Sequence, residues 1–356
     1  MEQACKINRK KPWFPGRVPA LLGLLALFCF AESGPWLQAL SAQEPAGSRK
    51  TRSAKKPKDK KPFLSLGSFK DKRITESSGV VTAQADPDGA ASNAIWTLND
   101  SGGAAMLFRV GFKGQTQATL ILNGCKNRDW ESMCRVVVDG KNHLAVGEVG
   151  DNLKKNLSCK IYVVPEPDVK PKFDSAGKLR VQEFESKFKT ITFTYRDGPK
   201  NCEAMSYNTE DKSYWFVEKV YVDDSRKKPP GIYVLPDPLA AKSKPGEDKP
   251  GIVKPKNVAK RVASFSVRNV TGMAFSPDNQ RLVIRNYFGA WLYEKADGKT
   301  WVETVNKTKA KVITLPLQSQ GEAICFTADS KSLLLTSEFA NAIIWQVRVE
   351  NPKDKE

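Results

Sequence analysis

From Phe63 onward the chain reads as short apolar runs rich in Val, Ile, Phe, Tyr and Trp, each bounded by a turn sequence. Turns such as Asp88-Gly89, Asp139-Gly140 and Asp297-Gly298 separate the runs. No long stretch carries the apolar period of an amphipathic helix. The pattern predicts an all-β domain.

Five of these runs begin alike, with a polar residue, a small residue and then an apolar residue. They start at Ser78, Glu131, Glu203, Thr271 and Glu322, and most continue through a turn into a second, a third and a fourth apolar run. Repeated strand groups of this size predict a β-propeller. We expect five blades, with six as the alternative if one of the longer intervals hides a further blade. A parallel β-helix is the structural alternative, but its repeats would be much shorter.

The fifth repeat ends without a fourth run, whereas an apolar strand at residues 63–69 precedes the first repeat. We predict that this N-terminal strand supplies the missing outer strand and closes the ring, which protects the sheet edges. The extra length at residues 165–188 and 222–258 is rich in Lys, Pro and Asp and is expected to form surface insertions.

The N-terminal region has the layout of a signal peptide. Basic residues up to Arg17 precede an apolar run from Val18 to Ala31, and small residues follow around Ala42. The continuous apolar stretch is short for a membrane span. We predict a signal peptide over residues 1–42, with retention as an anchor as the alternative, and therefore a secreted protein of the periplasm or cell surface.

The net charge of +18 is unevenly distributed, because residues 1–61 hold 13 Lys and Arg against 4 Asp and Glu, or +9. Residues 43–61 are predicted to be a basic disordered linker, residues 62–350 the propeller and residues 351–356 a disordered tail. The basic run is interpreted as a tether rather than an arm that docks on an anionic polymer. We expect a monomer with no nucleic-acid partner, and membrane contact only through an uncleaved signal.

Removal of the signal would leave five cysteines, an odd number, in a compartment that permits disulfides. Cys125 and Cys134 are the best candidates for a bond by proximity. Cys325 is predicted to be a buried thiol on an apolar strand.

In a propeller the start of each inner strand and the end of the second strand lie on one face. The strand starts place Ser78, Glu131, Glu203, Thr271 and Glu322 on that face. The second-strand ends, with Arg128 nearby, add Asn99, Asp100, Glu148, Asp151, Asn152, Glu218, Lys219, Arg285, Asn286, Ser337 and Glu338.

So many carboxylates around one channel mouth require a neutralising partner. One candidate is Ca²⁺, which takes six to eight oxygen ligands and suits the segment Gly147-Glu148-Val149-Gly150-Asp151-Asn152. The other is internal pairing with Arg128, Lys219 and Arg285. A structural alternative is that each strand-one Glu caps backbone amides of the neighbouring blade and repeats because the blades repeat.

The chemistry of an enzyme here is restricted by the single histidine, His143, which falls in the turn on the opposite face. A Ser-His-Asp site and a zinc site built from His and Cys are therefore not supported. Carboxylate or metal chemistry remains open, either glycoside cleavage by paired acids or phosphoester hydrolysis with Lys219 and Arg285 holding the phosphate.

Five motifs carry a resemblance to a family of secreted bacterial propellers of unsettled activity. They are Trp96-Thr-Leu-Asn-Asp-Ser-Gly-Gly103, Asn127-Arg-Asp-Trp-Glu131, Gly147-Glu-Val-Gly-Asp-Asn152, Asn201-Cys-Glu-Ala204 and Gln320-Gly-Glu-Ala323. More distantly the chain resembles the calcium-dependent propeller phytases and phytase-like esterases, whose fold has six blades. That resemblance implies Glu131, Glu148, Asp151, Glu203 and Glu322 as calcium ligands, but this chain lacks their dense set of Lys and Arg on the same face.

The sequence therefore predicts a secreted propeller whose acidic, calcium-binding mouth binds a ligand or partner. A metal-dependent hydrolase of phosphoesters or sugars is the alternative. The metal set is Glu131, Glu148, Asp151, Asn152, Glu203 and Glu322. The residues expected to contact the bound small molecule, polymer or protein are Asn99, Asp100, Arg128, Glu218, Lys219, Arg285, Asn286 and Glu338.

Overall fold

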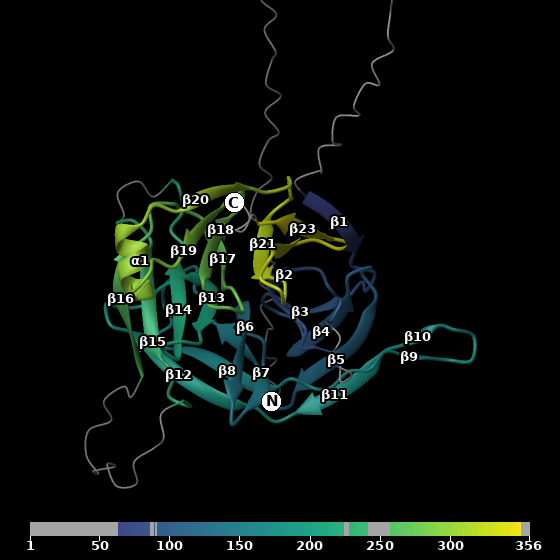
Figure 1. The fold of residues 1–356 in the computed structure, drawn as a ribbon. Coiled ribbons are helices and arrows are strands. Elements are labelled where there is room, and N and C mark those ends of the chain that lie inside the picture. Colours follow the sequence, from purple (N-terminus) through teal and green to yellow (C-terminus); the bar gives the residue numbers. More distant parts are fainter. Residues whose placement is uncertain (1–62, 86–88, 90, 224–227, 241–256, 350–356) are drawn as a thin grey trace, which may run out of the picture. The chain divides into compact units, whose positions relative to one another are not determined.

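The computed structural model describes residues 63–85, 89, 91–223, 228–240 and 257–349. The predicted signal peptide, the basic linker and the C-terminal tail lie outside these residues, as does most of the insertion at 222–258. The described strands form antiparallel sets arranged around a common centre, which is the propeller that the sequence predicts (Figure 1). We number these sets as blades 1 to 5 in chain order.

Each blade starts with an inner strand beside the centre and adds strands outward. Blade 1 consists of β2 (Ser77–Thr82), β3 (Ala94–Asn99), β4 (Met106–Gly111) and β5 (Thr116–Leu122). Blade 2 consists of β6 (Trp130–Val138), β7 (Lys141–Glu148), β8 (Cys159–Pro165) and β12 (Lys189–Tyr195). Blade 3 consists of β13 (Cys202–Asn208), β14 (Ser213–Glu218), β15 (Gly231–Pro236) and β16 (Val258–Ser264).

Blade 4 consists of β17 (Val270–Phe275), β18 (Arg281–Asn286), β19 (Gly289–Glu294) and β20 (Lys311–Thr314). The short helix α1 (Trp301–Lys307) lies between β19 and β20 and starts with a capping box formed by Thr300 and Glu303. Blade 5 consists of β21 (Gly321–Phe326), β22 (Ser332–Ser337), β23 (Ile343–Arg348) and the N-terminal strand β1 (Phe63–Ser68).

Strand β1 pairs antiparallel with β23, from Phe63 opposite Val347 to Ser68 opposite Ile343. The N-terminal strand therefore completes the last blade and closes the ring, as the sequence predicts (Figure 1). The closure removes the free edge that β23 would otherwise expose.

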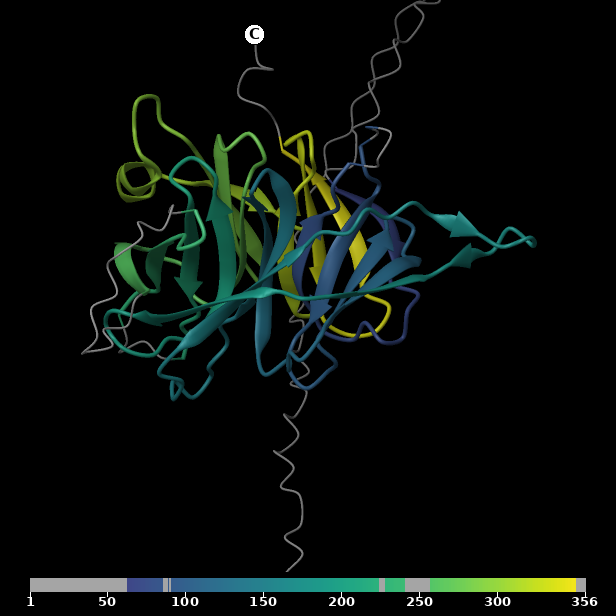
Figure 2. The same cartoon turned by 90° about the horizontal axis from the view of Figure 1, so that it is seen from below.

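The first insertion differs from a simple surface loop. It forms the projecting hairpin of β9 (Lys172–Phe173) and β10 (Leu179–Arg180), and then β11 (Gln182–Ser186), which pairs parallel with β5 of blade 1 (Figure 2). A second parallel pairing, of β12 with β16, joins blades 2 and 3 into one eight-stranded sheet. These two parallel pairings connect the outer strands of neighbouring blades.

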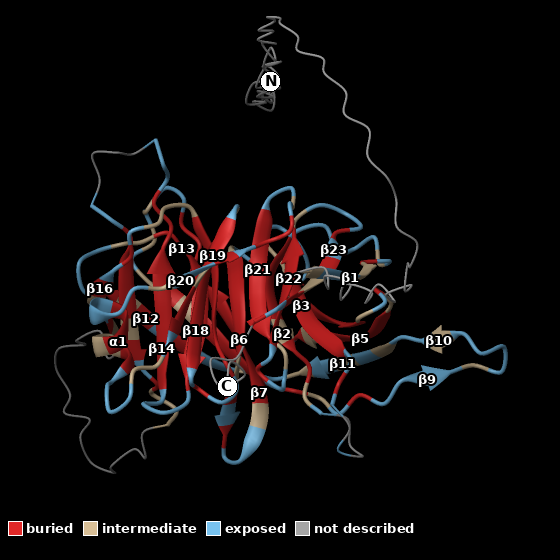
Figure 3. Ribbon diagram, turned by 45° about the horizontal axis from the view of Figure 1, so that its top comes forward, coloured by how far each residue is buried: buried red, intermediate tan, exposed pale blue. Residues whose placement is uncertain are grey.

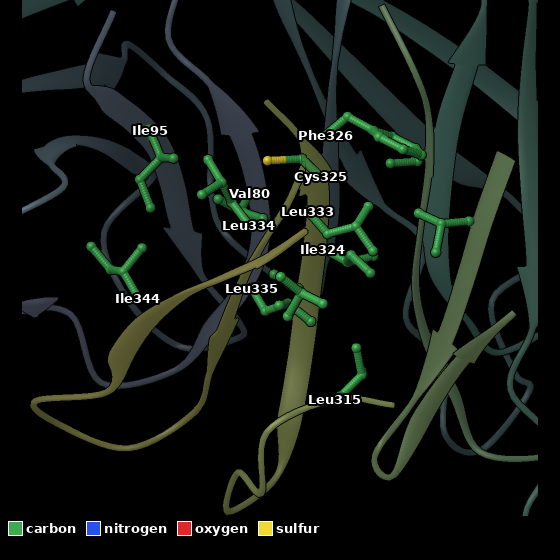
Figure 4. Close-up of a cluster of buried hydrophobic side chains, with 14 of the residues drawn as sticks. Val80, Ile95, Leu315, Ile324, Cys325, Phe326, Leu333, Leu334, Leu335 and Ile344 are labelled. Atoms are coloured by element: carbon green, nitrogen blue, oxygen red, sulfur yellow. The ribbon is translucent and has the colours of Figure 1, made fainter. Parts of the chain in front are cut away.

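The inner strands are almost fully buried, whereas the hairpin of β9 and β10 is largely exposed (Figure 3). Apolar side chains fill the spaces between blades, as in the cluster of Val80 on β2 with Ile324 and Leu335 of blade 5 (Figure 4). Hydroxyl groups bridge adjacent inner strands, with Thr82 donating to the Phe326 carbonyl at 2.6 Å and Thr271 donating to the Gly321 carbonyl at 3.0 Å. These two bonds join β21 to β2 on one side and to β17 on the other.

The cysteines correct one prediction. Cys125 and Cys134 are both free thiols, because Cys125 lies in the loop after β5 whereas Cys134 lies inside β6. Cys325 is buried on β21, as predicted. None of the helices in the described part of the chain has the length and apolar character needed to cross a bilayer.

Candidate functional site

The repeated polar residues occupy a repeated irregularity of the backbone. At the start of every inner strand the pairing with the second strand slips by a residue, for instance between Trp130 and Ser132 and between Cys202 and Ala204. The residues skipped by these slips are Ser78, Glu131, Glu203, Thr271 and, with Ala323, Glu322. A bulge of this kind redirects one side chain out of the sheet pattern. The repeated sequence motif therefore marks the positions of the bulges, and these bulges form a ring around the channel mouth.

Three of the bulged residues are carboxylates that face one another. Glu131, Glu203 and Glu322 are each at most 5% exposed. Burial raises the pKa of Glu131 well above its usual range, and the nearby Glu203 carboxylate raises it further. Burial and Glu203 likewise raise the pKa of Glu322 to about 9. The mouth therefore holds mutually repelling carboxyl groups in a site with little water.

The tightest convergence of oxygens involves Glu131 and two aspartates of neighbouring loops. One carboxylate oxygen from each of Asp100, Asp129 and Glu131 lies within 4.8 Å of the others. Burial and repulsion from Asp129 raise the pKa of Asp100 to about 6, and burial raises the pKa of Asp129 as well. Within the described chain, the Glu131 carboxylate has neither a hydrogen bond nor an ion pair.

Backbone contacts hold this trio in place. The Asn127 side-chain amide donates to the Asn99 carbonyl at 3.0 Å and to the Asp100 carbonyl, and its oxygen accepts the Trp130 N–H at 3.2 Å. Gly150 packs directly against the trio, because a Cβ there would lie 2.6 Å from Asp129 Oδ2 and 2.7 Å from Glu131 Oε1. Because Gly150 has no side chain, the Asp129 and Glu131 carboxylates can both lie close to its backbone.

Two buried cations lie near the carboxylates of the mouth. The Lys219 ammonium group pairs with Glu203 and donates to the Tyr287 hydroxyl at 2.8 Å. The fully buried Arg285 guanidinium donates to the Ala323 carbonyl at 3.0 Å and to the Gln318 side chain at 3.1 Å. Burial lowers the pKa of Arg285 to about 10. Lys219 and Arg285 are thus both held by hydrogen bonds, and Lys219 also by an ion pair, to other groups of the protein.

Three predicted metal ligands are not part of this trio and have partners of their own, although Glu148 and Asp151 are near enough to Asp129 to raise its pKa. Glu148 accepts from the Tyr162 hydroxyl at 2.9 Å and pairs with Arg128 at 3.3 Å, beside a cavity of about 550 Å³. Asp151 accepts the backbone N–H groups of Lys155 and Asn156 and so organises the loop after β7. Asn152 accepts from Asn201 and from the Tyr221 hydroxyl.

Of the residues predicted to contact a ligand, some lie at the mouth and others bind neighbouring groups of the protein. Asp100, Lys219, Arg285 and Glu338 lie at the mouth, and burial with repulsion from Asp100 raises the pKa of Glu338 to about 7. Asn99 and Asn286 instead accept backbone N–H groups of adjacent turns. Arg128 pairs with Glu148, and Glu218 pairs with Lys154 at 2.7 Å.

Sequence reasoning missed Asp129 and Tyr287. Asp129 stands within the quoted motif Asn127-Arg-Asp-Trp-Glu131, two residues before a bulged Glu, so its spacing from Glu131 was the available signal. Tyr287 belongs to the turn after β18 and has no counterpart in the repeat. Its role at the mouth emerges only from the hydrogen bond to Lys219.

Comparisons with known proteins assign neither a family nor an activity to this chain. No protein-family model and no curated protein matches the chain. Among solved structures, U3-55K (9% identity, TM-score 0.37) and the RRP9 WD40 repeats (8%, 0.36) each match 81% of this chain, over 98% and 100% of their own chains. A Bacteroides uniformis protein put forward as a 6-phosphogluconolactonase matches 78% of this chain and 68% of its own, at 12% identity and a TM-score of 0.34. Similarities at this level carry no functional argument, so the propeller assignment rests on the strand topology.

Proposed function

We propose that the protein is an exported binding propeller whose channel mouth holds a divalent cation of the calcium class and uses it to bind a polar ligand or partner. The observation that carries the proposal is the convergence of Asp100, Asp129 and Glu131 within 4.8 Å, with no internal cation paired to Glu131 in the described chain. The signal-like N-terminus supports export.

The donor set fits calcium by its chemistry. Three carboxylates offer up to six oxygens, and calcium accepts six to eight oxygen ligands in flexible geometry. A bound cation would also remove the mutual repulsion that raises the pKa of Asp100 and Glu131. Zinc, which favours His and Cys ligands, fits this all-carboxylate group less well.

The arrangement favours binding over phosphoester hydrolysis. Lys219 is committed to Glu203 and Tyr287, and Arg285 is committed to a carbonyl oxygen and an amide oxygen, so neither is poised to hold a phosphate. The hydrolase alternative predicts turnover of a model phosphoester in calcium, abolished by Glu131→Gln.

The test is the thermal midpoint of the purified protein in calcium and in excess chelator. Calcium at about 100 times its Kd should stabilise the fold by ~2.7 kcal/mol. Glu131→Gln should abolish most of that difference. Glu148→Gln is the matched control, because Glu148 is equally buried but bound by Tyr162 and Arg128. A midpoint that is the same in calcium and in chelator, or an equal loss in both variants, would reject the site.

A further inference from the structure

The channel ends in an apolar pocket on the face opposite the acidic mouth. The bulged residue is the second residue of every inner strand, and Val80, Met133, Met273, Ile324 and Phe326 lie two or four residues farther along the chain. These side chains line a cavity of about 260 Å³, to which all the inner strands of blades 1 to 5 contribute. The two ends of one channel thus have opposite chemistry.

Several polar side chains around this pocket already have partners. Thr82 donates to the Phe326 carbonyl, Ser206 accepts the Phe275 N–H at 2.9 Å, and Tyr207 donates to Asp237 at 3.0 Å. The Arg135 guanidinium, at the pocket edge, donates to the Thr82 carbonyl and pairs with Glu166 at 2.9 Å. A ligand with hydrogen-bonding groups would therefore find few free partners and would lose its own hydration.

The remaining lining is apolar and polarisable. Met133 and Met273 are each at most 3% exposed, and the Cys134 and Cys325 thiols add two more sulfur atoms to the wall. Phe275 and Phe326 contribute aromatic rings. Sulfur atoms and aromatic edges make favourable contacts with aromatic rings, and methionine adapts to their shape.

The size of the cavity restricts the occupant. An apolar cavity of about 150 Å³ is enough to take up benzene. At about 260 Å³ this pocket has room for a larger ring system. We infer that the apolar end of the channel is a second binding site, which takes a small neutral aromatic molecule of two or three fused or linked rings. This site is independent of the cation at the mouth.

The probe for this site is N-phenyl-1-naphthylamine, a neutral two-part aromatic whose fluorescence rises in an apolar environment. Titration of the full-length protein should give saturable binding that naphthalene displaces. Chelation and the Glu131→Gln variant should leave the affinity unchanged, so failure of the calcium proposal and failure of this one are distinguishable.

Two variants, Ala328→Trp and Met273→Trp, test whether the probe binds in this pocket. Ala328→Trp places a large side chain at the exposed rim of the pocket without altering the buried wall, and it should weaken binding at least tenfold. Ala176→Trp, at an exposed alanine of the turn between β9 and β10, is the matched control and should bind as the parent protein does. Met273→Trp fills the cavity directly, with circular dichroism as the check on folding. Absence of saturable binding, or equal affinity in Ala328→Trp and Ala176→Trp, would overturn the inference.

Discussion

At the scale of single residues, the charge balance of the mouth depends on Lys219, which lies among carboxylates. The Lys219 and Glu203 side chains are 6% and 7% exposed, and they form an ion pair next to Glu131 and Glu322. Burial raises the pKa of Glu203, and the nearby Lys219 partly offsets this, leaving it at about 7. Buried pairs of this kind add little net stability, but the loss of one partner leaves a buried charge without compensation.

Lys219→Met should therefore destabilise the protein by about 3–5 kcal/mol, measured as the free energy of unfolding in denaturant. Adding Glu203→Gln to Lys219→Met should recover much of this loss, because the unpaired acid is then removed. Lys295→Met is the control, since its partner Glu210 is 52% exposed and such pairs contribute about 0–1 kcal/mol. Equal losses in Lys219→Met and Lys295→Met would show that the mouth pair is screened by solvent.

At the scale of elements, the seam between the last blade and the first depends on close backbone approach. The turn between β4 and β5 contains Gly114, whose φ is +89° and whose added Cβ would lie 1.7 Å from the Ser68 carbonyl oxygen. The Gly114 carbonyl also accepts the Lys70 N–H at 2.9 Å, just after β1. A side chain at this glycine would push the closing strand outward.

Gly114→Ala should cost clearly more stability than Gly140→Ala, as measured by thermal midpoints. Gly140, in the turn between β6 and β7, has a φ of +75° and nothing within 4 Å of an added Cβ, so it reports the backbone cost alone. That cost is about 1–2 kcal/mol. The excess at Gly114 measures the clash with β1, and similar midpoints for the two variants would contradict this account of the seam.

At the scale of the whole molecule, a basic chain encloses an acidic channel mouth. The pKa values there are raised mainly by burial, to about 6 for Asp100 and about 7 for Glu203 and Glu338. A carboxyl group with a raised pKa binds its proton more tightly in the folded state than in the unfolded state. Its stabilising effect is complete below the unfolded pKa near 4 and is lost as the pH rises through the folded value.

Without calcium, the thermal midpoint should therefore fall as the pH rises from about 5 to about 8. Calcium should counter this fall, because it replaces the protons, so its stabilising effect should increase with pH across the same range. The lowered pKa values of Asp71, Asp278 and Asp329 act in the opposite sense, but below this window. Midpoints measured against pH in chelator and in calcium check the prediction. A midpoint in chelator that stays constant or rises would contradict it.

The fold was largely predictable because its signals are local. Alternating apolar runs predict strands, the repeat predicts blades, and the unpartnered strand at the N-terminus predicts closure with β23. The parallel pairing of β11 with β5 was not predictable, because residues 165–188 are rich in polar residues and carry no period that identifies a partner.

The composition of the candidate site was less predictable. The sequence places Glu131 and Glu148 on the same face, yet only Glu131 occupies a bulge and faces the channel, while Glu148 is held by Tyr162. Asp129 joins Glu131 because the loop before β6 folds against Gly150. Such contacts depend on residues from separate loops.

The amino-acid sequence by itself determined the propeller, its closing strand and the acidic residues that repeat at the strand starts. These features follow from hydrophobic periodicity and from repetition, which are properties of the linear chain. The tertiary structure decided which acids converge, which are paired, and that the far end of the channel is apolar. The physical reason is that a bulge or a loop contact shifts the strand register by one residue. A shift of one residue moves a carboxylate from one face of a strand to the other.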